Sequence, residues 1–447
     1  MKIFSLILIL FTFTSFGQNI SGKVLDNKNN LPIKNVNVYL TKTKEGTTTN
    51  KKGKFNLKFK SLAKPTDTIT FSIIGYASKS FVLNELKINN NTIHLSEKIE
   101  ELKEVLLNSD KKLKSKIHFN KLSSLKGGLH SFGSSLIENK IYVIGGDASY
   151  FEDNAKRTLY YYGDIDFEEL LKKLRMNFSW ENYKGDLQIY DIFTDTWTMP
   201  DLKFRERAYN TINYYNNKIY VMGGTRLSRN RKFEYLDDKI EVFDIKTKSI
   251  IIDDTNPHQA TNFASFIYDN NVIVMGGSVK LKNNGEKLFT NKSHIYNLES
   301  GYWYQLKDMP KAKEVKGVLI KNKIYLIGGF NNKPLKEIET YDITNGKWEK
   351  EGELFIGINH PALTAHNNLI YIFNDGKICT YNIDTKELNE YLIDLFLKSS
   401  SLFYYNDKLY LLGGFKEDEF SKTPTSKLYS INLNEFEKTA ISKSKKL

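Results

Sequence analysis

The phrase NKIYVIGG, residues 139–146, occurs five times with small changes and decides the fold of most of the chain. The other copies are NKIYVMGG (217–224), NNVIVMGG (270–277), NKIYLIGG (322–329) and DKLYLLGG (407–414). The apolar triplet predicts a strand buried on both faces, and the glycine pair ends that strand where neighbouring backbones crowd. Self-similarity of this kind predicts a repeat architecture, in which each unit covers the hydrophobic face of the next.

A second phrase follows each glycine pair and supplies the outer part of the repeat. It combines an aromatic residue, Asp or Asn, an aliphatic residue and a polar turn, as in YDIFTDTW (190–197) and YDITNGKW (341–348). In one repeat NDG (374–376) replaces the pair, and YNIDTKEL (381–388) follows. Six such repeats resemble kelch repeats, and this resemblance implies a six-bladed β-propeller over residues 117–447.

A propeller also requires large aromatic side chains between its blades and a strand that closes the circle of blades. Trp197, Trp303 and Trp348 stand last in the second phrase, where flat aromatic area can fill the space between blades. Residues 117–128 are expected to close the ring by pairing with the C-terminal repeat. Residues 436–441 compete for the same role.

The residues before the repeats form a separate unit. Short alternating runs, among them SGKVLD, VNVYL, GKFNLKF and DTITFSI, are separated by turn residues, which is typical of a small β-sandwich. Their order up to ELKEVLL resembles the carboxypeptidase regulatory-like domain, a transthyretin-like accessory module without catalysis of its own. We therefore expect this domain at residues 18–109, a lysine-rich linker at 110–116, and an all-β fold throughout.

The first residues, MKIFSLILILFTFTSFGQ, have the layout of a secretory signal peptide. Lys2 supplies the positive start, an apolar stretch follows, and the small residues Ser15 and Gly17 precede a cut before Gln18. Residues 1–17 are thus predicted to be removed on export. We expect no transmembrane segment in the mature chain, because no later stretch has the necessary apolar length. The predicted location is the periplasm or the periplasmic face of the outer membrane, with secretion as the alternative.

Charge and composition narrow the classes of ligand. The net charge of +13 rests on lysines spread along the chain, which predicts a solvated basic surface. The export signal argues against nucleic acid as a partner. Cys379, the single cysteine, is expected to be a buried inert thiol, which excludes a disulfide framework. The histidines show no metal-ligand spacing, so no metal and no cofactor is predicted.

The arginines have an unusual distribution. All seven fall between residues 157 and 231, in the loops of the first two repeats. Arginine presents a planar, permanently charged fork that suits carboxylates and phosphates. We hypothesise a basic patch that binds an anionic group, such as a sugar acid or the carboxylates of a partner. Local salt bridges to Asp and Glu residues such as Asp237 and Asp238 are the alternative.

Some histidines and acids stand where the repeats predict the rim of a central channel. His130, His258 and His360 lie near the start of an innermost strand, and a structural role is the alternative for each. Asp147 and Glu314 are possible acids at the same rim. The candidate ligand-binding residues are Arg205, Arg207, Arg226, Arg229, His130, His360 and Asp147. No catalytic residue is predicted, since the sequence contains no GxSxG or HExxH motif.

The loop at residues 147–184 carries a predicted helix in DFEELLKKLRMN (166–177). Asp166 can cap this helix, and Phe167, Leu170, Leu171 and Leu174 give it one apolar face. We expect the helix to pack on the propeller face as a lid. Docking of a partner on the helix is the alternative.

Two functions from different classes follow from these features. The repeat itself carries no catalytic group, so the sequence favours a non-enzymatic, exported binding or scaffold protein of the cell envelope that presents propeller-face loops to a protein or glycan. The alternative is a cofactor-independent sugar-acid epimerase or mutarotase, that is, an isomerase acting on a carbohydrate. It rests on the similarity to N-acetylneuraminate epimerases, which are signal-bearing six-bladed kelch proteins.

Overall fold

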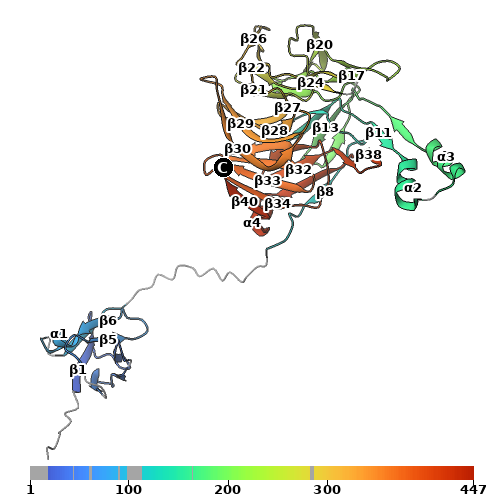
Figure 1. Ribbon diagram of the computed structural model, residues 1–447. Coiled ribbons are helices and arrows are strands. Elements are labelled where there is room, and N and C mark those ends of the chain that lie inside the picture. Colours follow the sequence, from blue (N-terminus) through green and yellow to red (C-terminus); the bar gives the residue numbers. More distant parts are fainter. Residues whose placement is uncertain are drawn as a thin grey trace, which may run out of the picture. The chain divides into compact units, whose positions relative to one another are not determined.

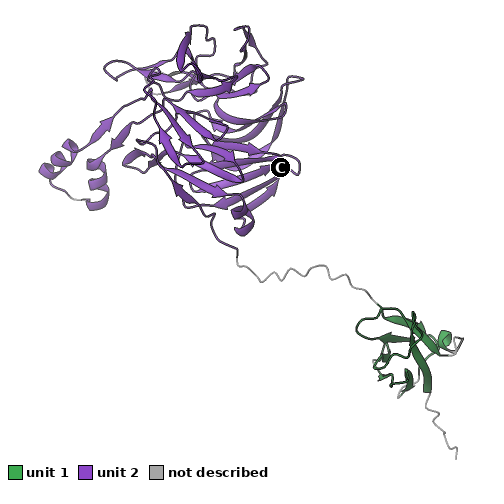
Figure 2. Cartoon of the chain, turned by 180° about the vertical axis from the view of Figure 1, so that it is seen from behind, with its two compact units in different colours: residues 1–111 green, residues 112–447 purple. Residues whose placement is uncertain are grey.

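The computed structural model describes residues 19–43, 45–59, 63–88, 91–97, 113–163, 165–281 and 286–447 (Figure 1). The predicted signal peptide lies outside the described residues. The chain divides into two compact units, residues 1–111 and 112–447 (Figure 2). Strands dominate both units, so the expected all-β fold is confirmed.

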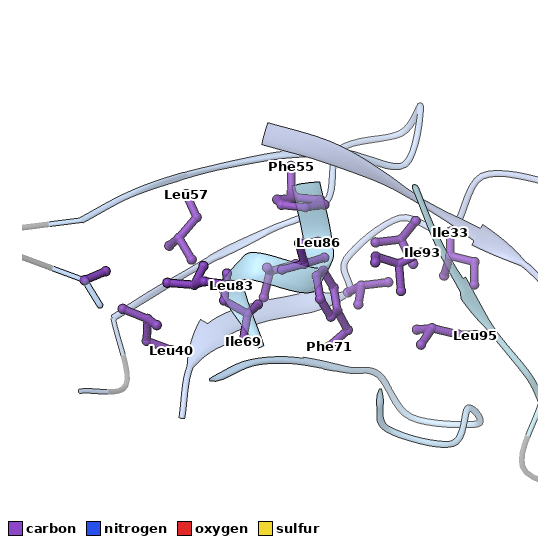
Figure 3. Close-up of a cluster of buried hydrophobic side chains, with 14 of the residues drawn as sticks. Ile33, Leu40, Phe55, Leu57, Ile69, Phe71, Leu83, Leu86, Ile93 and Leu95 are labelled. Atoms are coloured by element: carbon purple, nitrogen blue, oxygen red, sulfur yellow. The ribbon is translucent and has the colours of Figure 1, made fainter. Parts of the chain in front are cut away.

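The first unit is a β-sandwich. One sheet joins β4 (Lys54–Lys58), β1 (Asn19–Asp26) and β7 (Thr92–Leu95), and the other joins β3 (Gly46–Thr48), β2 (Asn37–Leu40), β5 (Thr68–Ser72) and β6 (Lys79–Val82). Strand alternation turns side chains such as Phe55 and Ile69 inward (Figure 3). Helix α1 (Leu83–Ile88) adds Leu86 to the same core.

The second unit consists of six antiparallel blades, in which the strands follow one another from the innermost outward, except that the outermost strands of the last two blades come from the two ends of this unit. Blade 1 is β9 (Gly133–Ile137), β10 (Lys140–Ile144), β13 (Leu187–Asp191) and β14 (Thr196–Thr198). Blade 2 is β15 (Thr211–Tyr215), β16 (Lys218–Met222), β19 (Ile240–Asp244) and β20 (Ser249–Asp253). Blade 3 is β21 (Ala264–Tyr268), β22 (Asn271–Met275), β25 (Ser293–Asn297) and β26 (Trp303–Gln305).

The remaining blades complete a closed ring. Blade 4 is β27 (Glu314–Ile320), β28 (Lys323–Phe330), β29 (Pro334–Asp342) and β30 (Lys347–Ile358). Blade 5 is β31 (Ala362–His366), β32 (Leu369–Asn374), β33 (Lys377–Asn382), β34 (Glu387–Leu392) and β40 (Lys443–Lys446). Blade 6 is β35 (Ser401–Tyr405), β36 (Lys408–Leu412), β39 (Leu428–Asn432) and β8 (Asn120–Leu122). A hydrogen bond of 2.9 Å between the hydroxyls of Ser134 and Ser401 joins the first and last innermost strands.

The N-terminal end of this unit closes the ring, as predicted. Strand β8 pairs with β39, with Leu122 opposite Leu428. The competing residues 436–441 instead belong to α4 (Asn434–Lys438) and to the turn that leads into β40 of blade 5. Residues 114–116, expected in the exposed linker, instead contact the propeller: the Lys114 amide donates to the Lys438 carbonyl (2.9 Å).

The repeated phrases have the structural roles that their residue types predict. Trp303 lies opposite Tyr296 across β25 and β26, and the two rings stack at 4.6 Å. Both glycines of each pair have positive φ, and a Cβ on Gly224 would lie 2.3 Å from the Ala208 carbonyl oxygen. A larger residue there would therefore force the chain apart. Cys379 is buried, as expected, and burial raises the pKa of its thiol to about 12.

The long insertion of blade 1 forms an arm rather than a lid. It consists of β11 (Tyr150–Glu152), α2 (Asn154–Tyr162), α3 (Phe167–Arg175) and β12 (Phe178–Trp180), and Figure 1 shows both helices extending away from the blades. The cap is confirmed, since the Asp166 carboxylate accepts from the Glu169 amide (2.8 Å). The expected packing on the propeller is wrong: no residue of α3 is buried, and Phe167 is 73% exposed. The paired strands β11 and β12 carry the helices outward.

A candidate binding site at the mouth of the central channel

One residue from each blade stands at the entrance to the central channel. Strand register defines its position. In blade 1, Gly133 of the innermost strand pairs with Ile144, the last residue of the second strand, and the residue at the entrance lies two positions before Gly133. The same count applies in every blade. These six residues, which we call the mouth ring, are Ser131, Tyr209, Asn262, Glu314, His360 and Ser399. All except Glu314 have a left-handed backbone. Non-glycine residues in this conformation are uncommon and cluster at functional sites.

Two adjoining cavities open at the mouth ring. The mouth cavity has a volume of about 610 Å³, and the channel cavity, between the innermost strands, has a volume of about 170 Å³. Both cavities are lined by every residue of the ring except Glu314. The arrangement provides a wide antechamber above a narrow polar channel, which is the usual concave form of a small-molecule or peptide site.

Hairpins between the second and third strands of several blades wall the mouth cavity. Blade 2 contributes β17 (Thr225–Leu227) with β18 (Glu234–Leu236), and blade 3 contributes β23 (Ser278–Leu281) with β24 (Lys287–Phe289). Blade 6 contributes β37 (Phe415–Glu417) with β38 (Ser421–Pro424), and β38 also pairs with β11 of the arm. Loop side chains on a rigid scaffold therefore surround the site.

Glu314 ties three blades together beneath this wall. Its buried carboxylate accepts from Ser278 Oγ (2.7 Å) and Lys287 Nζ (2.8 Å) of blade 3, and from His360 Nε2 (2.8 Å) of blade 5. Burial alone would raise the pKa of Glu314, but the hydrogen bond and charge of His360, together with Lys287, lower it to about 2. Glu314 was predicted as a rim acid, and its geometry is that of a cross-blade tie.

The predicted histidines separate into two groups. His130 and His360 both line the mouth cavity. His130 is fully buried, and burial lowers its pKa to about 4. Its Nε2 lies 3.4 Å from the carboxylate of Asp147, and that carboxylate accepts a hydrogen bond from the Tyr209 hydroxyl (3.0 Å). His258 lies elsewhere, with its Nδ1 at 3.0 Å from Nδ1 of His294.

The four candidate arginines do not converge on the cavities. Arg207 is fully buried, and its guanidinium forms ion pairs with Asp237 (3.1 Å) and Glu241. Arg205 pairs with Asp237 (3.0 Å). Arg226 is half-buried on β17, Arg229 is exposed, and the described lining of both cavities contains none of the four. Arg205 and Arg207 thus form the local salt bridges that were the alternative to a basic ligand-binding patch. Ligand binding by the candidate residues stays a prediction.

Sequence reasoning missed the polar groups that the channel presents. Lys316 lines the channel cavity, and Asn262 and Ser399 line both cavities. A signal was available in the repeats: Lys316 is the register equivalent of Gly133, Thr211, Ala264, Ala362 and Ser401. A long cationic side chain thus occupies a position where the other blades carry a small residue.

Comparison with known proteins agrees with this architecture. Residues 20–107 match the family model described as the CarboxypepD_reg-like domain, and residues 180–376 match the model described as the KLHDC2/KLHL20/DRC7 Kelch-repeats domain. The chain combines a carboxypeptidase regulatory-like domain with kelch repeats. Both predicted resemblances are thereby confirmed, and kelch repeats typically mediate binding between proteins.

Curated relatives of this kelch chain are similar over part of their length. Kelch repeat and BTB domain-containing protein 2 of Cowpox virus is 27% identical over 194 residues, which is 40% of this chain and 34% of that protein. Kelch-like protein 40 of Xenopus tropicalis is 28% identical over 158 residues, or 35% of this chain and 24% of that protein. The kelch chain thus spans between a quarter and a third of these relatives.

The described residues contain no group of three or more His, Cys, Asp or Glu side chains placed to hold a metal ion. Within the same part of the chain, no helix has the length and apolar character needed to cross a bilayer.

Proposed function

We propose that this kelch protein is an exported, non-enzymatic binding protein of the cell envelope, and that it holds a partner protein at the mouth cavity and the surrounding hairpins. The carrying observation is the mouth itself, a concave site of about 610 Å³ enclosed by hairpins from separate blades. Kelch repeats typically bind proteins, which supports a protein as the partner.

The side chains on the rim have the composition of a protein interface. Phe233 and Tyr235 on the blade 2 hairpin are exposed, and Trp180 at the base of the arm is half exposed, with the Arg231 guanidinium 5.1 Å from its ring. Aromatic residues and arginine are enriched among the residues that dominate protein–protein affinity. Such rings left in water favour a surface that a partner covers.

Export and envelope location rest on the predicted signal peptide, residues 1–17. A carboxypeptidase regulatory-like domain ahead of the propeller fits a spacing or attachment role, with the kelch unit doing the binding. Cell fractionation that compares the full chain with a variant lacking residues 2–17 tests the proposed cellular location. The full chain is expected in the envelope or medium and the variant in the cytoplasm, and equal distribution of the two would contradict export.

Site-specific photo-crosslinking in cells tests the binding surface. A photoreactive phenylalanine analogue replaces Tyr235, which is 58% exposed on the rim, or Tyr304, which is 57% exposed on the outermost strand of blade 3. The matched exposure makes Tyr304 the control. A discrete adduct from position 235 alone is the expected result. Adducts of equal yield at both positions, or none at 235, would argue against the mouth as the interface.

A further inference from the structure

Lys316 places a cationic side chain in the channel, and the carboxylate that acts on it electrostatically is that of Glu314. It lies on β27, is half-buried, and lines the channel cavity. No ion pair or hydrogen bond joins its ammonium to any residue in the described ranges. The nearby carboxylate of Glu314 is engaged by Lys287 and His360. An ammonium removed from water without a partner is costly, so the site favours an anion brought in from outside.

Two neutral polar groups face the same space and are also unoccupied. Asn262 is 5% exposed, yet its side-chain amide has no hydrogen bond to the described part of the chain. The Ser399 hydroxyl likewise has no partner among these residues. Both line the mouth and channel cavities, from blades 3 and 6. Asn262 is buried and Ser399 is half-buried, and polar groups removed from water are normally hydrogen-bonded, so both side chains are available to a ligand or water at this level.

We propose that the channel cavity binds the carboxylate group of a small organic acid, with Lys316 as the counter-ion and Asn262 and Ser399 as hydrogen-bond donors. The channel cavity of about 170 Å³ admits only a small end group, while the mouth cavity above it has room for the rest of the molecule. A carboxylate accepts several hydrogen bonds at once, which suits one ammonium, one amide and one hydroxyl. The ligand enters past His360 and Tyr209.

The alternatives in the channel are weaker on the same observations. A cation would meet the Lys316 ammonium. Glu314 offers it no carboxylate, because Lys287 and His360 occupy both oxygens. Burial lowers the pKa of Lys316, against the raising effect of Glu314, and a bound carboxylate would raise that pKa further. This anion site does not depend on the partner protein proposed above, and crosslinking at position 235 reports on that partner separately.

The test uses acetate as the probe on the full mature chain. Thermal unfolding of the propeller is followed by tryptophan fluorescence, because all four tryptophans (Trp180, Trp197, Trp303 and Trp348) lie in this unit. Sodium acetate is titrated at constant ionic strength against sodium chloride and against sodium phosphate. The proteins are the wild type, Lys316→Met, and the matched control Lys347→Met, which changes an exposed lysine.

Acetate is expected to raise the unfolding temperature of the wild type and of Lys347→Met in a saturable way. In Lys316→Met the apparent Kd for acetate should be at least about tenfold weaker, the usual loss for a hydrogen-bonded charge. Equal stabilisation of Lys316→Met and wild type would overturn the proposal, as would no effect of acetate on the wild type. Stabilisation by phosphate alone would overturn the carboxylate assignment in favour of an inorganic anion.

Discussion

Arg207 and Lys316 are two cationic side chains inside the same propeller, and they differ in burial and in the carboxylates that they meet. Arg207, in blade 2, is fully buried and meets the carboxylates of Asp237 and Glu241. Lys316, in blade 4, reaches the channel and meets no carboxylate within ion-pair distance among the described residues. One cation is neutralised by the chain that carries it, and the other is not.

The difference separates a structural charge from a binding charge. A buried guanidinium with two carboxylates has little affinity left for a ligand, and its removal leaves Glu241 without its ion-pair partner and Asp237 with Arg205 alone. An ammonium that faces a cavity without a partner has the opposite properties: its removal costs the fold little and the ligand much. Arg205 and Arg207, within the arginine-rich part of the sequence, therefore form ion pairs inside the chain, whereas Lys316 is the charge that we propose for binding.

The comparison predicts the largest effect for Arg207→Ala. Breaking a buried ion pair by removing one partner typically costs about 3–5 kcal/mol of unfolding free energy, because the partner charges stay buried. The urea midpoint of the propeller, read by tryptophan fluorescence, is the measurement. Arg205→Ala is the matched control, since the Arg205 side chain is 23% exposed and shares Asp237, and it should lose clearly less. A loss below about 1 kcal/mol for Arg207→Ala would show that the pair is not structural.

The repeat phrases allowed the fold to be predicted because their physics is local. A doubly buried strand, a glycine pair with positive φ and a Tyr–Trp stack are each determined within about ten residues of sequence. Closure by residues 117–128 also follows from topology, since an incomplete last blade needs a fourth strand. The arm differed from its prediction because the apolar face of α3 indicated burial, while the neighbouring strands β11 and β12 carry that helix away from the blades.

The site was harder to predict because its partners are far apart in the sequence. Arg207 meets Asp237 and Glu241 only after the blade 2 hairpin folds back, and Glu314 meets Lys287 and His360 from two other blades. Residue types and their spacing in the sequence therefore could not show which cationic side chain is paired with a carboxylate. Counting back from the glycine pair would have shown Lys316 among small residues, because it and its equivalents all lie 12 residues before the pair, or before Asn374 in blade 5.

Buried histidines extend the comparison to side chains that are neutral in the folded protein near pH 7. Burial, and then the neighbouring His294, lower the pKa of His258 from 6.5 to about 4. Between these two pKa values the unfolded chain binds a proton at His258 and the folded chain does not. The unfolding free energy is therefore unaffected by His258 above pH 6.5 and decreases as the pH falls toward 4. A shift of this size corresponds to on the order of 3 kcal/mol at the low end of the window.

A pH series isolates this effect. The unfolding free energy between pH 7 and 5 is compared for wild type, His258→Gln and His118→Gln, the last at an exposed histidine. Glutamine can still donate to the Gly276 carbonyl, which His258 contacts at 2.9 Å, but it does not titrate. The His258→Gln profile should be flatter than the other two, although His130 retains part of the slope. Three parallel profiles would exclude His258 as a source of acid sensitivity.

Lys316→Met has the smallest expected effect on the unfolding free energy. It sharpens the comparison most, because the expected change is opposite in sign to that of Arg207→Ala. Without acetate or another bound anion, Lys316→Met should leave the unfolding free energy unchanged or raise it by up to about 1 kcal/mol, since an unpaired ammonium is exchanged for an apolar chain of similar length. Lys347→Met, at an exposed site, should stay within about 0.5 kcal/mol of wild type. Urea midpoints in chloride buffer give both values. A loss of more than about 2 kcal/mol for Lys316→Met would mean that the ammonium makes a stabilising contact within the chain, and Lys316 would then belong with Arg207 as a structural cation.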